Sequence, residues 1–492
     1  MSTDPLNEPT GVVGLDAILG GGLLRRGMVC LVGGPGTGKT VLAQQLAFVA
    51  AREGRAALYF SGLSEPHERL IEHIRAFDFF DEALIAQWVQ LLSLSPALEQ
   101  DEDEAVDMVV QTARRTAARL IIVDGFGTLR RLLQNERETI RFLYRLSTQV
   151  GLLGALLIVT VEGDPHETTI YPELATADIL VGLYYERTHV SHRRYLEVLK
   201  RRGTAPLPGL HTFTIDNAGL TCYPQLEAVL PKDSDAPFDP AARAPFDLPE
   251  LDVMLGGGLT QQTTTIVAGN PGTGKTLLGI QFLAAGVARG EKGLFLGFRE
   301  TAVQLIAKAA QHGLDLAGAM ERDMIRLTVQ PPVALDSDIL AWQLHEAITA
   351  TGARRLVIDS AAELEAAVAR ARIRDYLAAI LTFLRAEGVT AIMTRETAGL
   401  FAENPDFVYE PAAVLADNVL LLRQVQARGE LHRVLAVIRM RFSGHARTIR
   451  QFTITERGLT VLGPWAGEAG LQQELAQVTG MLAVPPQAEP RP

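Results

Sequence analysis

Two eight-residue segments combine glycines, a lysine and a threonine in a pattern typical of phosphate binding. They read Gly-Gly-Pro-Gly-Thr-Gly-Lys-Thr at 33–40 and Gly-Asn-Pro-Gly-Thr-Gly-Lys-Thr at 269–276. Glycines allow the backbone to curl so that successive N–H groups point at phosphate oxygens. The residues predicted to bind the phosphates of a nucleotide are Gly34, Gly36, Thr37, Gly38, Lys39 and Thr40 in the first segment, and Gly272, Thr273, Gly274, Lys275 and Thr276 in the second.

The lysine and threonine of each segment have separate predicted roles. Lys39 and Lys275 would reach the β- and γ-phosphates and assist catalysis, while the hydroxyls of Thr40 and Thr276 would ligate Mg²⁺. Each segment follows an apolar, β-like run (28–32 and 264–268) and precedes a helical pattern, which is the context that this motif requires. The chain has 44 glycines, yet chance does not account for two copies in this context. The sequence therefore predicts two nucleotide sites.

A carboxylate at the end of a later apolar strand completes the predicted magnesium site. Asp124 ends the run Leu-Ile-Ile-Val, and Asp359 ends Arg-Leu-Val-Ile. A carboxylate there can hold the hydrated Mg²⁺ that bridges the β- and γ-phosphates. An aspartate that ends a strand is often only a helix cap or a turn former, but its pairing with a phosphate loop in both halves favours the metal role.

Hydrolysis also needs a group that polarises the attacking water. Glu65, in Ser-Gly-Leu-Ser-Glu-Pro, and Glu300, in Gly-Phe-Arg-Glu-Thr, follow the strand after the first long helix of each half. A glutamate at the carboxyl edge of a parallel strand can act as a general base. It can equally be a solvated residue that caps the next helix, and the residues alone leave both interpretations open.

Each half also carries a pair of cations near its end. Alternate residues of a strand share a face, so Lys200 points with Arg202, and Arg439 with Arg441. Such pairs could reach a γ-phosphate bound by a neighbouring subunit. Ordinary surface charge on a strand is the competing interpretation.

The repeat extends well beyond the phosphate loops. Gly-Leu-Asp-Ala-Ile-Leu-Gly-Gly-Gly-Leu at 14–23 recurs as Glu-Leu-Asp-Val-Met-Leu-Gly-Gly-Gly-Leu at 250–259, an offset of 236 residues (250 − 14). A period of this length indicates a duplicated domain. We predict an N-terminal domain at 1–223, a linker rich in proline and aspartate at 224–246, a C-terminal domain at 247–462, and a partly disordered tail at 463–492.

Within each copy, short and continuous apolar runs alternate with helical patterns. This arrangement predicts an α/β domain with a mainly parallel sheet that is buried on both faces by helices. In the first half the expected strands cover 28–32, 56–60, 120–123, 155–161 and 179–183, and the expected long helices cover 41–53 and 104–119. Segments 195–200 and 211–215 are expected to add antiparallel strands at one side.

Composition narrows the class of protein. The 492 residues include 46 basic and 57 acidic side chains, a formal charge of −11, so there is no general basic surface for nucleic acid. The two cysteines give neither a disulfide framework nor a metal knuckle. No uninterrupted apolar run reaches the length of a membrane span, and the N-terminus lacks the features of a signal peptide. We expect a cytoplasmic protein without nucleic-acid or membrane partners.

Together, the Gly-Leu-Asp…Gly-Gly-Gly-Leu lead-in, the phosphate loop, the strand-end aspartate and the Lys/Arg-Xaa-Arg strand resemble the KaiC-like family of tandem RecA-like ATPases. The resemblance spans about residues 8–462. It implies two RecA-like P-loop NTPase domains in tandem, ATP and Mg²⁺ as ligands, and a homo-oligomeric, hexameric ring that holds ATP between subunits. It also assigns ATP contacts to Lys200, Arg202, Thr204, Arg433, Arg439 and Arg441.

The chain departs from this resemblance at the catalytic and phosphorylated positions. Members that act in the circadian clock carry two adjacent glutamates where this chain has Ser64-Glu65 and Arg299-Glu300, so slow hydrolysis is expected. Ala413 and Val414 stand at the phosphoacceptor positions and have no hydroxyl, so phosphorylation there cannot occur. The leading hypothesis is a regulatory ATPase that forms a ring and signals to a protein partner. The alternatives are a nucleotide-gated scaffold, a RecA-like DNA motor and a kinase of another protein.

Overall fold

The computed structural model describes residues 7–62, 67–133, 135–166, 172–187, 192–230, 237–333, 335–397, 411–427 and 429–465. The chain divides into two compact units at the boundary between Val229 and Leu230. Parts of the predicted linker belong to folded elements: α9 (Leu226–Val229) closes the first unit, and β12 (Arg243–Ala244) pairs with β13 (Leu259–Thr260) in the second. The predicted tail lies outside the described residues from 466 onward.

The first unit is built on a nine-stranded sheet in the order β11-β10-β9-β8-β3-β7-β6-β4-β5. The strands from β8 to β5 are parallel, and β9, β10 and β11 extend the sheet in antiparallel fashion. The strands are β3 (Gly27–Gly33), β4 (Ala57–Ser61), β5 (Val89–Ser93), β6 (Leu120–Asp124), β7 (Leu156–Glu162), β8 (Ile179–Arg187), β9 (His192–Arg201), β10 (His211–Asp216) and β11 (Gly219–Tyr223).

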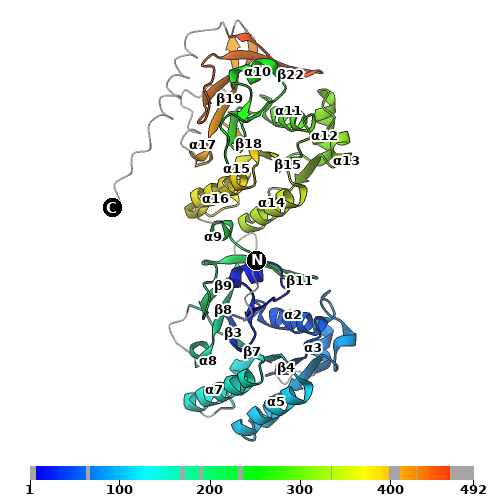
Figure 1. Ribbon diagram of the computed structural model, residues 1–492, viewed down its shortest axis with the longest axis vertical. Coiled ribbons are helices and arrows are strands. Elements are labelled where there is room, and N and C mark those ends of the chain that lie inside the picture. The colour runs from blue at the N-terminus through cyan, green and yellow to red at the C-terminus, as the bar shows by residue number, and fades with distance from the viewer. Residues whose placement is uncertain are drawn as a thin grey trace, which may run out of the picture. The chain divides into compact units, whose positions relative to one another are not determined.

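Helices cover both faces of this sheet (Figure 1). They are α1 (Leu15–Leu19), α2 (Lys39–Arg52), α3 (His67–Ile74), α4 (Ser95–Leu98), α5 (Glu102–Thr116), α6 (Phe126–Arg130), α7 (Glu136–Leu152) and α8 (Pro172–Thr176). Side chains of β3 alternate between two cores: Val29 and Leu31 pack with α2, whereas Met28 and Cys30 pack with α5 and α7. The continuous apolar run of β3 is therefore explained by burial on both faces.

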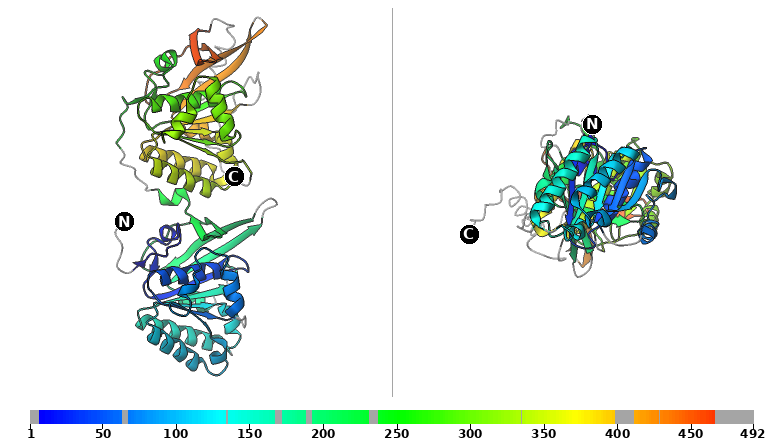
Figure 2. Two further views of the ribbon diagram at one scale, coloured as in Figure 1. Left: turned by 90° about the vertical axis from the view of Figure 1, so that its right-hand side faces the viewer. Right: turned by 90° about the horizontal axis from the view of Figure 1, so that it is seen from below.

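The second unit repeats this arrangement in the order β16-β15-β17-β18-β14-β19-β20-β21-β22. Its strands are β14 (Thr264–Gly269), β15 (Gly293–Gly297), β16 (Ile325–Val329), β17 (Arg355–Asp359), β18 (Thr390–Glu396), β19 (Asn418–Ala427), β20 (Glu430–Arg439), β21 (Arg450–Thr455) and β22 (Gly458–Pro464). Its helices are α10 (Pro249–Met254), α11 (Lys275–Val287), α12 (Ala302–Gln311), α13 (Leu316–Glu321), α14 (Ser337–Thr351), α15 (Ala361–Ala366), α16 (Ile373–Ala386) and α17 (Pro411–Leu415). The left view of Figure 2 shows the layered build of each unit, with antiparallel strands extending from the layers.

The predicted α/β class, with a mainly parallel sheet, flanking helices and a β extension in each copy, is confirmed. The edge strand β5 was not among the strands expected in the first half, and its counterpart in the second unit is β16. They are short and only partly buried, so their sequences lack the continuous apolar run that marks the inner strands. No helix in the described parts of the chain is long and apolar enough to cross a lipid bilayer.

Candidate nucleotide and magnesium sites

Each phosphate loop joins a central strand to the helix behind it, β3 to α2 and β14 to α11. The third and fourth glycines of the first loop, Gly36 and Gly38, have φ angles of 74° and 104°. A Cβ added at Gly38 would lie 2.5 Å from Ile215 Cδ1, and one at Gly274 would lie 2.6 Å from Ile454 Cδ1. The positive φ therefore favours glycine at this position, and the neighbouring isoleucine would have to shift to admit a Cβ.

The loop lysines are held at the centre of their loops. Lys39 Nζ donates to the carbonyl oxygens of Gly33 and Gly34, each at 2.8 Å. Lys275 Nζ makes the same two contacts with the second loop, at 2.9 and 2.8 Å. Both side chains are over nine-tenths buried, and burial lowers the pKa of each ammonium. An anionic phosphate in the loop would favour the charged form of both lysines.

The predicted magnesium ligands of the second unit lie together. Thr276 Oγ1 donates to Asp359 Oδ2 at 2.7 Å, and Thr394 donates to the other carboxylate oxygen. The second hydroxyl comes from β18, which lies between the strand of Asp359 and the strand of the loop. It fixes the carboxylate with one oxygen toward Thr276.

The first unit has the same pair with one more hydroxyl. Thr40 Oγ1 lies 3.1 Å from Asp124 Oδ2, and Thr160 Oγ1 donates to Oδ1 at 2.5 Å. Tyr59 also donates to Oδ2, at 2.6 Å. Burial and the neighbouring Asp124 raise the pKa of Tyr59 well above its ordinary value, so the phenol stays a donor. Phe295 occupies the corresponding place in β15, and the two magnesium sites therefore differ.

These residues fit Mg²⁺ bound together with a nucleotide. Magnesium prefers one or two protein oxygens, with phosphates and water completing its shell. One carboxylate and one hydroxyl in contact supply that set in each unit. The described residues contain no group of three or more His, Cys, Asp or Glu side chains suited to a metal. A magnesium site that is completed by phosphate oxygens does not need such a group. Bound Mg²⁺ would supply charge stabilisation at the β- and γ-phosphates.

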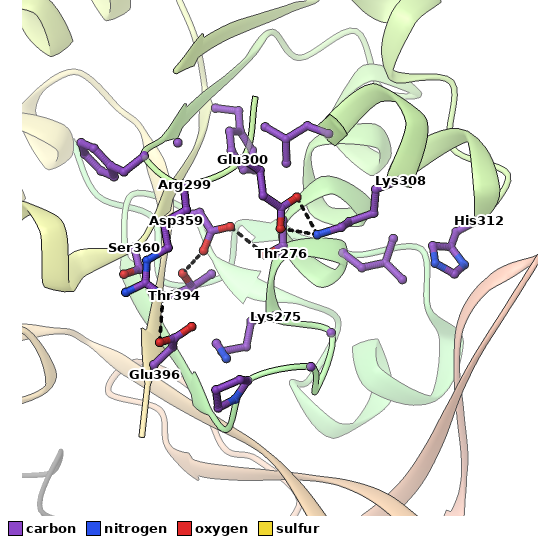
Figure 3. A pocket seen from close by; sticks show the side chains of 18 of the residues that line it. Lys275, Thr276, Arg299, Glu300, Lys308, His312, Asp359, Ser360, Thr394 and Glu396 are labelled. Carbon is purple, nitrogen blue, oxygen red and sulfur yellow. Dashed lines mark hydrogen bonds and ion pairs between the residues drawn. The ribbon is translucent and has the colours of Figure 1, made fainter. Parts of the chain in front are cut away.

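The predicted bases differ in how far they can be located. Glu65 lies outside the described residues. Glu300 lines a cavity of about 350 Å³ together with Lys275, Thr276 and Asp359, but Lys308 contacts both of its carboxylate oxygens, with Nζ 2.6 Å from Oε2. Figure 3 shows this ion pair at the α12 side of the cavity.

Arg299 makes two ion pairs across the same cavity. Its Nε donates to Glu363 Oε1 at 2.7 Å, and its Nη1 lies 2.9 Å from Glu396 Oε2. These two contacts hold the pKa of the guanidinium above its usual value. The arginine that replaces a glutamate of the clock proteins is therefore a fixed positive charge at the mouth of the second site.

Sequence reasoning missed two carboxylates at strand ends, Glu162 in the first unit and Glu396 in the cavity of the second. Each is the last residue of the strand beside the phosphate-loop strand, paired with Gly33 and Gly269 respectively. A signal was present: Thr-Xaa-Glu occurs at 160–162 and again at 394–396, an offset of 234 residues (394 − 160). The threonine of this repeat contacts the strand-end aspartate in both units.

The predicted cation pairs lie near the amino end of the parallel strands, whereas the phosphate loop of their own unit lies at the carboxyl end. Lys200 pairs with Leu180 of β8, and the neighbouring residue of β8, Ile179, pairs with Val29 at the start of β3. The loop begins at Gly33, four residues on, or about 13 Å at 3.3 Å per residue. Lys200 and Arg202 do not meet the phosphate loop of their own unit.

The second unit places its cations in the same way. Arg439 pairs with Val419, beside Ile266 of β14, and donates to the Ala413 and Ala416 carbonyls. Arg441 lies 3.4 Å from the Asp417 carboxylate. Arg439 and Arg441 are thus also displaced from Lys275 along the strands.

Arg433 lies nearer the opposite end of β20, paired with Gln424 and Phe452. Its Nε is buried without a hydrogen-bond partner among the described residues, as is the Nε of Arg194 at the equivalent place in β9. Thr204 accepts a hydrogen bond from Arg201, the last residue of β9. Arg194 was not predicted, although it precedes Lys200 by the same six residues that separate Arg433 from Arg439.

Two parallel-sheet units, each with a phosphate loop, a loop lysine and a Thr–Asp pair, define a tandem P-loop NTPase of the RecA-like type. Comparison with known proteins agrees: the family model described as "ATPase: KaiC" matches residues 8–227 and again 245–465. The chain belongs to the KaiC ATPase family.

Similar proteins include two with clock-related names. The circadian clock protein KaiC3 of Synechocystis is 26% identical over 96% of both chains. The circadian clock oscillator protein KaiC of Thermostichus vulcanus is 27% identical over 92% of this chain and 88% of its own. These matches extend across both units of the chain.

Proposed function

We propose that the protein binds Mg·ATP in both units and hydrolyses it slowly, and that the bound nucleotide regulates a ring of identical chains. The observation that carries this proposal is the duplicated cradle: an inward-facing lysine at a glycine loop, with a threonine–aspartate pair beside it. A nucleotide triphosphate with Mg²⁺ matches the charge and the donors of that cradle.

The positions of the predicted cations support the proposed assembly of several chains. The predicted cations lie at the end of the strands opposite the phosphate loop of their own unit; they are Lys200, Arg202, Arg439 and Arg441. A neighbouring copy could present its ATP to them, which is the arrangement of a hexameric ring with nucleotides between subunits. Ala413 is buried and Val414 partly buried in α17, and neither can accept a phosphoryl group. The regulatory output is therefore proposed to be nucleotide-dependent shape or assembly, read by a protein partner.

A nucleotide-gated scaffold with little turnover is the second candidate. The pairing of Glu300 with Lys308 favours it, since both oxygens of the predicted base contact an ammonium group. In that case nucleotide binding, rather than hydrolysis, would switch the assembly.

One experiment tests both functions. ATP turnover and size-exclusion light scattering are measured on the intact chain with and without Mg·ATP, and on Lys39→Ala, Lys275→Ala and the double variant. We expect slow turnover, nucleotide-dependent oligomers, and loss of both in the double variant. Undiminished turnover in the double variant would refute the ATPase proposal. Assembly on ATP binding with no phosphate release would favour the scaffold.

A further inference from the structure

The two carboxylates at the second nucleotide site differ in their freedom to accept a proton. Glu300 has both oxygens against the Lys308 ammonium. Both oxygens are therefore occupied by the ammonium group, and neither is left open toward an attacking water. Glu396 is contacted by Arg299 at Oε2, 2.9 Å away, and among the described residues its Oε1 makes no hydrogen bond or ion pair. The side chain is 41% exposed, so water can reach it.

Glu396 also lies closer to the reacting end of the site. It ends β18, where its pairing partner is Gly269, the first residue of the phosphate loop. On the other side of β18 runs β17, which ends in Asp359. Glu396 thus stands between the strand of the loop and the strand of the magnesium ligand, and Figure 3 shows it beside Lys275, with Glu300 on the far side of the cavity. Its charge opposes the lowering of the Lys275 pKa more than that of Asp359 does.

Arg299 fixes the orientation of this carboxylate. It is shared between Glu363, which is 10% exposed and also accepts from Ser360, and Glu396. A base that is oriented by a third group is the arrangement that general-base catalysis needs. The first unit repeats the placement with Glu162, which pairs with Gly33 and is the carboxylate that most raises the pKa of Lys39.

We propose that Glu396, with Glu162 as its counterpart in the first unit, is the general base of ATP hydrolysis. This inference rests on the proposed function. The water oxygen forms a bond to the γ-phosphorus as the bond from that phosphorus to the β–γ bridging oxygen breaks. ADP departs with the electron pair, and the water proton moves to Glu396 Oε1. That proton then returns to the phosphate product or to bulk water, and Arg299 is a positioning residue.

The test uses the full chain carrying Lys39→Ala, so that turnover reports the second site. In this background Glu396→Gln is expected to lower kcat about 100-fold or more, the usual contribution of a general base, while affinity for a fluorescent ATP analogue changes less than about threefold. Glu300→Gln is measured alongside as the competing base. The matched control is Glu250→Gln, at an exposed carboxylate that pairs with Arg450 and does not line the cavity, and it is expected to keep kcat within about threefold.

Each other outcome has a definite meaning. Retained turnover in Glu396→Gln, or loss in Glu300→Gln alone, overturns the assignment while the ATPase function stands. A parent chain that binds ATP without turnover overturns it as well, because an oriented base predicts hydrolysis there. A parent that binds no ATP refutes the proposed function itself. The equivalent experiment for the first site uses Glu162→Gln in a chain that carries Lys275→Ala, and the same fall in kcat is expected.

Discussion

Replacing Arg299 by alanine should weaken ATP binding at the second site through charge alone. The side chain neutralises Glu363 and Glu396, which line or border the cavity that would take the phosphates. Without the arginine, Glu396 becomes an unopposed negative charge beside an anionic ligand. The variant should therefore bind ATP less tightly although no direct contact to the loop has been removed.

The magnitude follows from distance and exposure. Two unit charges about 5 Å apart interact by about 3 kcal/mol at an effective dielectric constant of about 20. Arg299 is 54% exposed and Glu396 41% exposed, so solvent screening reduces this to about 1 kcal/mol. That free energy corresponds to about a fivefold rise in Kd. The difference should shrink at high ionic strength, because exposed charges are screened by salt.

The assay is equilibrium titration with a fluorescent ATP analogue in the Lys39→Ala chain, at low and high salt. Arg289→Ala is the matched control, since Arg289 pairs with Asp247 in the same unit at a similar exposure but does not line the cavity. Its Kd should be unchanged. Equal or tighter ATP binding by Arg299→Ala, or the same loss in the control, would refute the electrostatic account.

Three further predictions concern the loop lysine and the magnesium sites. Burial lowers the pKa of Lys275, and a bound phosphate would raise it again. ATP affinity should therefore be full below the lowered pKa and fall by up to about tenfold per pH unit above it. Titration with ATP at rising pH checks this, and Lys275→Arg should remove the pH dependence. Asp359→Asn should raise the Mg²⁺ concentration needed for ATP binding about tenfold or more, with little change in metal-free ATP affinity, as measured by titrating Mg²⁺. Tyr59→Phe removes a donor to Asp124, so the first site should need less Mg²⁺, while the free energy of unfolding falls by about 1.5–3 kcal/mol, measured by urea denaturation.

Much of the fold was accessible from the sequence because the inner strands are buried on both faces. Continuous apolar runs such as 28–32 and 120–123 have one physical explanation in an α/β protein, and both proved to be strands. Edge strands carry no such constraint, which is why β5 was not predicted. The phosphate loops were equally readable, since the left-handed backbone at Gly38 and Gly274 favours glycine.

The contacts of Glu300 and Glu396 were harder to predict from the sequence. Nothing in the local sequence indicates that Glu300 meets Lys308 eight residues later, because that contact depends on how α12 turns after β15. The pairing of Arg299 with Glu363 and Glu396 joins the segment after β15, helix α15 and the end of β18, which are adjacent only in the folded unit. Such contacts need the strand order, and short-range patterns do not contain it.

The placement of the cation pairs links assembly to chemistry. In both units the polarity of the sheet puts the loop at the carboxyl end of the parallel strands and the Lys/Arg-Xaa-Arg residues near the amino end. Arg202 and Arg441 pair meanwhile with Asp178 and Asp417 in their own units. These pairs are about half exposed on the arginine side, so each contributes no more than about 1 kcal/mol, a small cost to exchange for a phosphate. If these cations bind a nucleotide, it is not the one held by the phosphate loop of their own unit. Where that nucleotide belongs to a neighbouring chain, ATP binding and assembly become the same equilibrium.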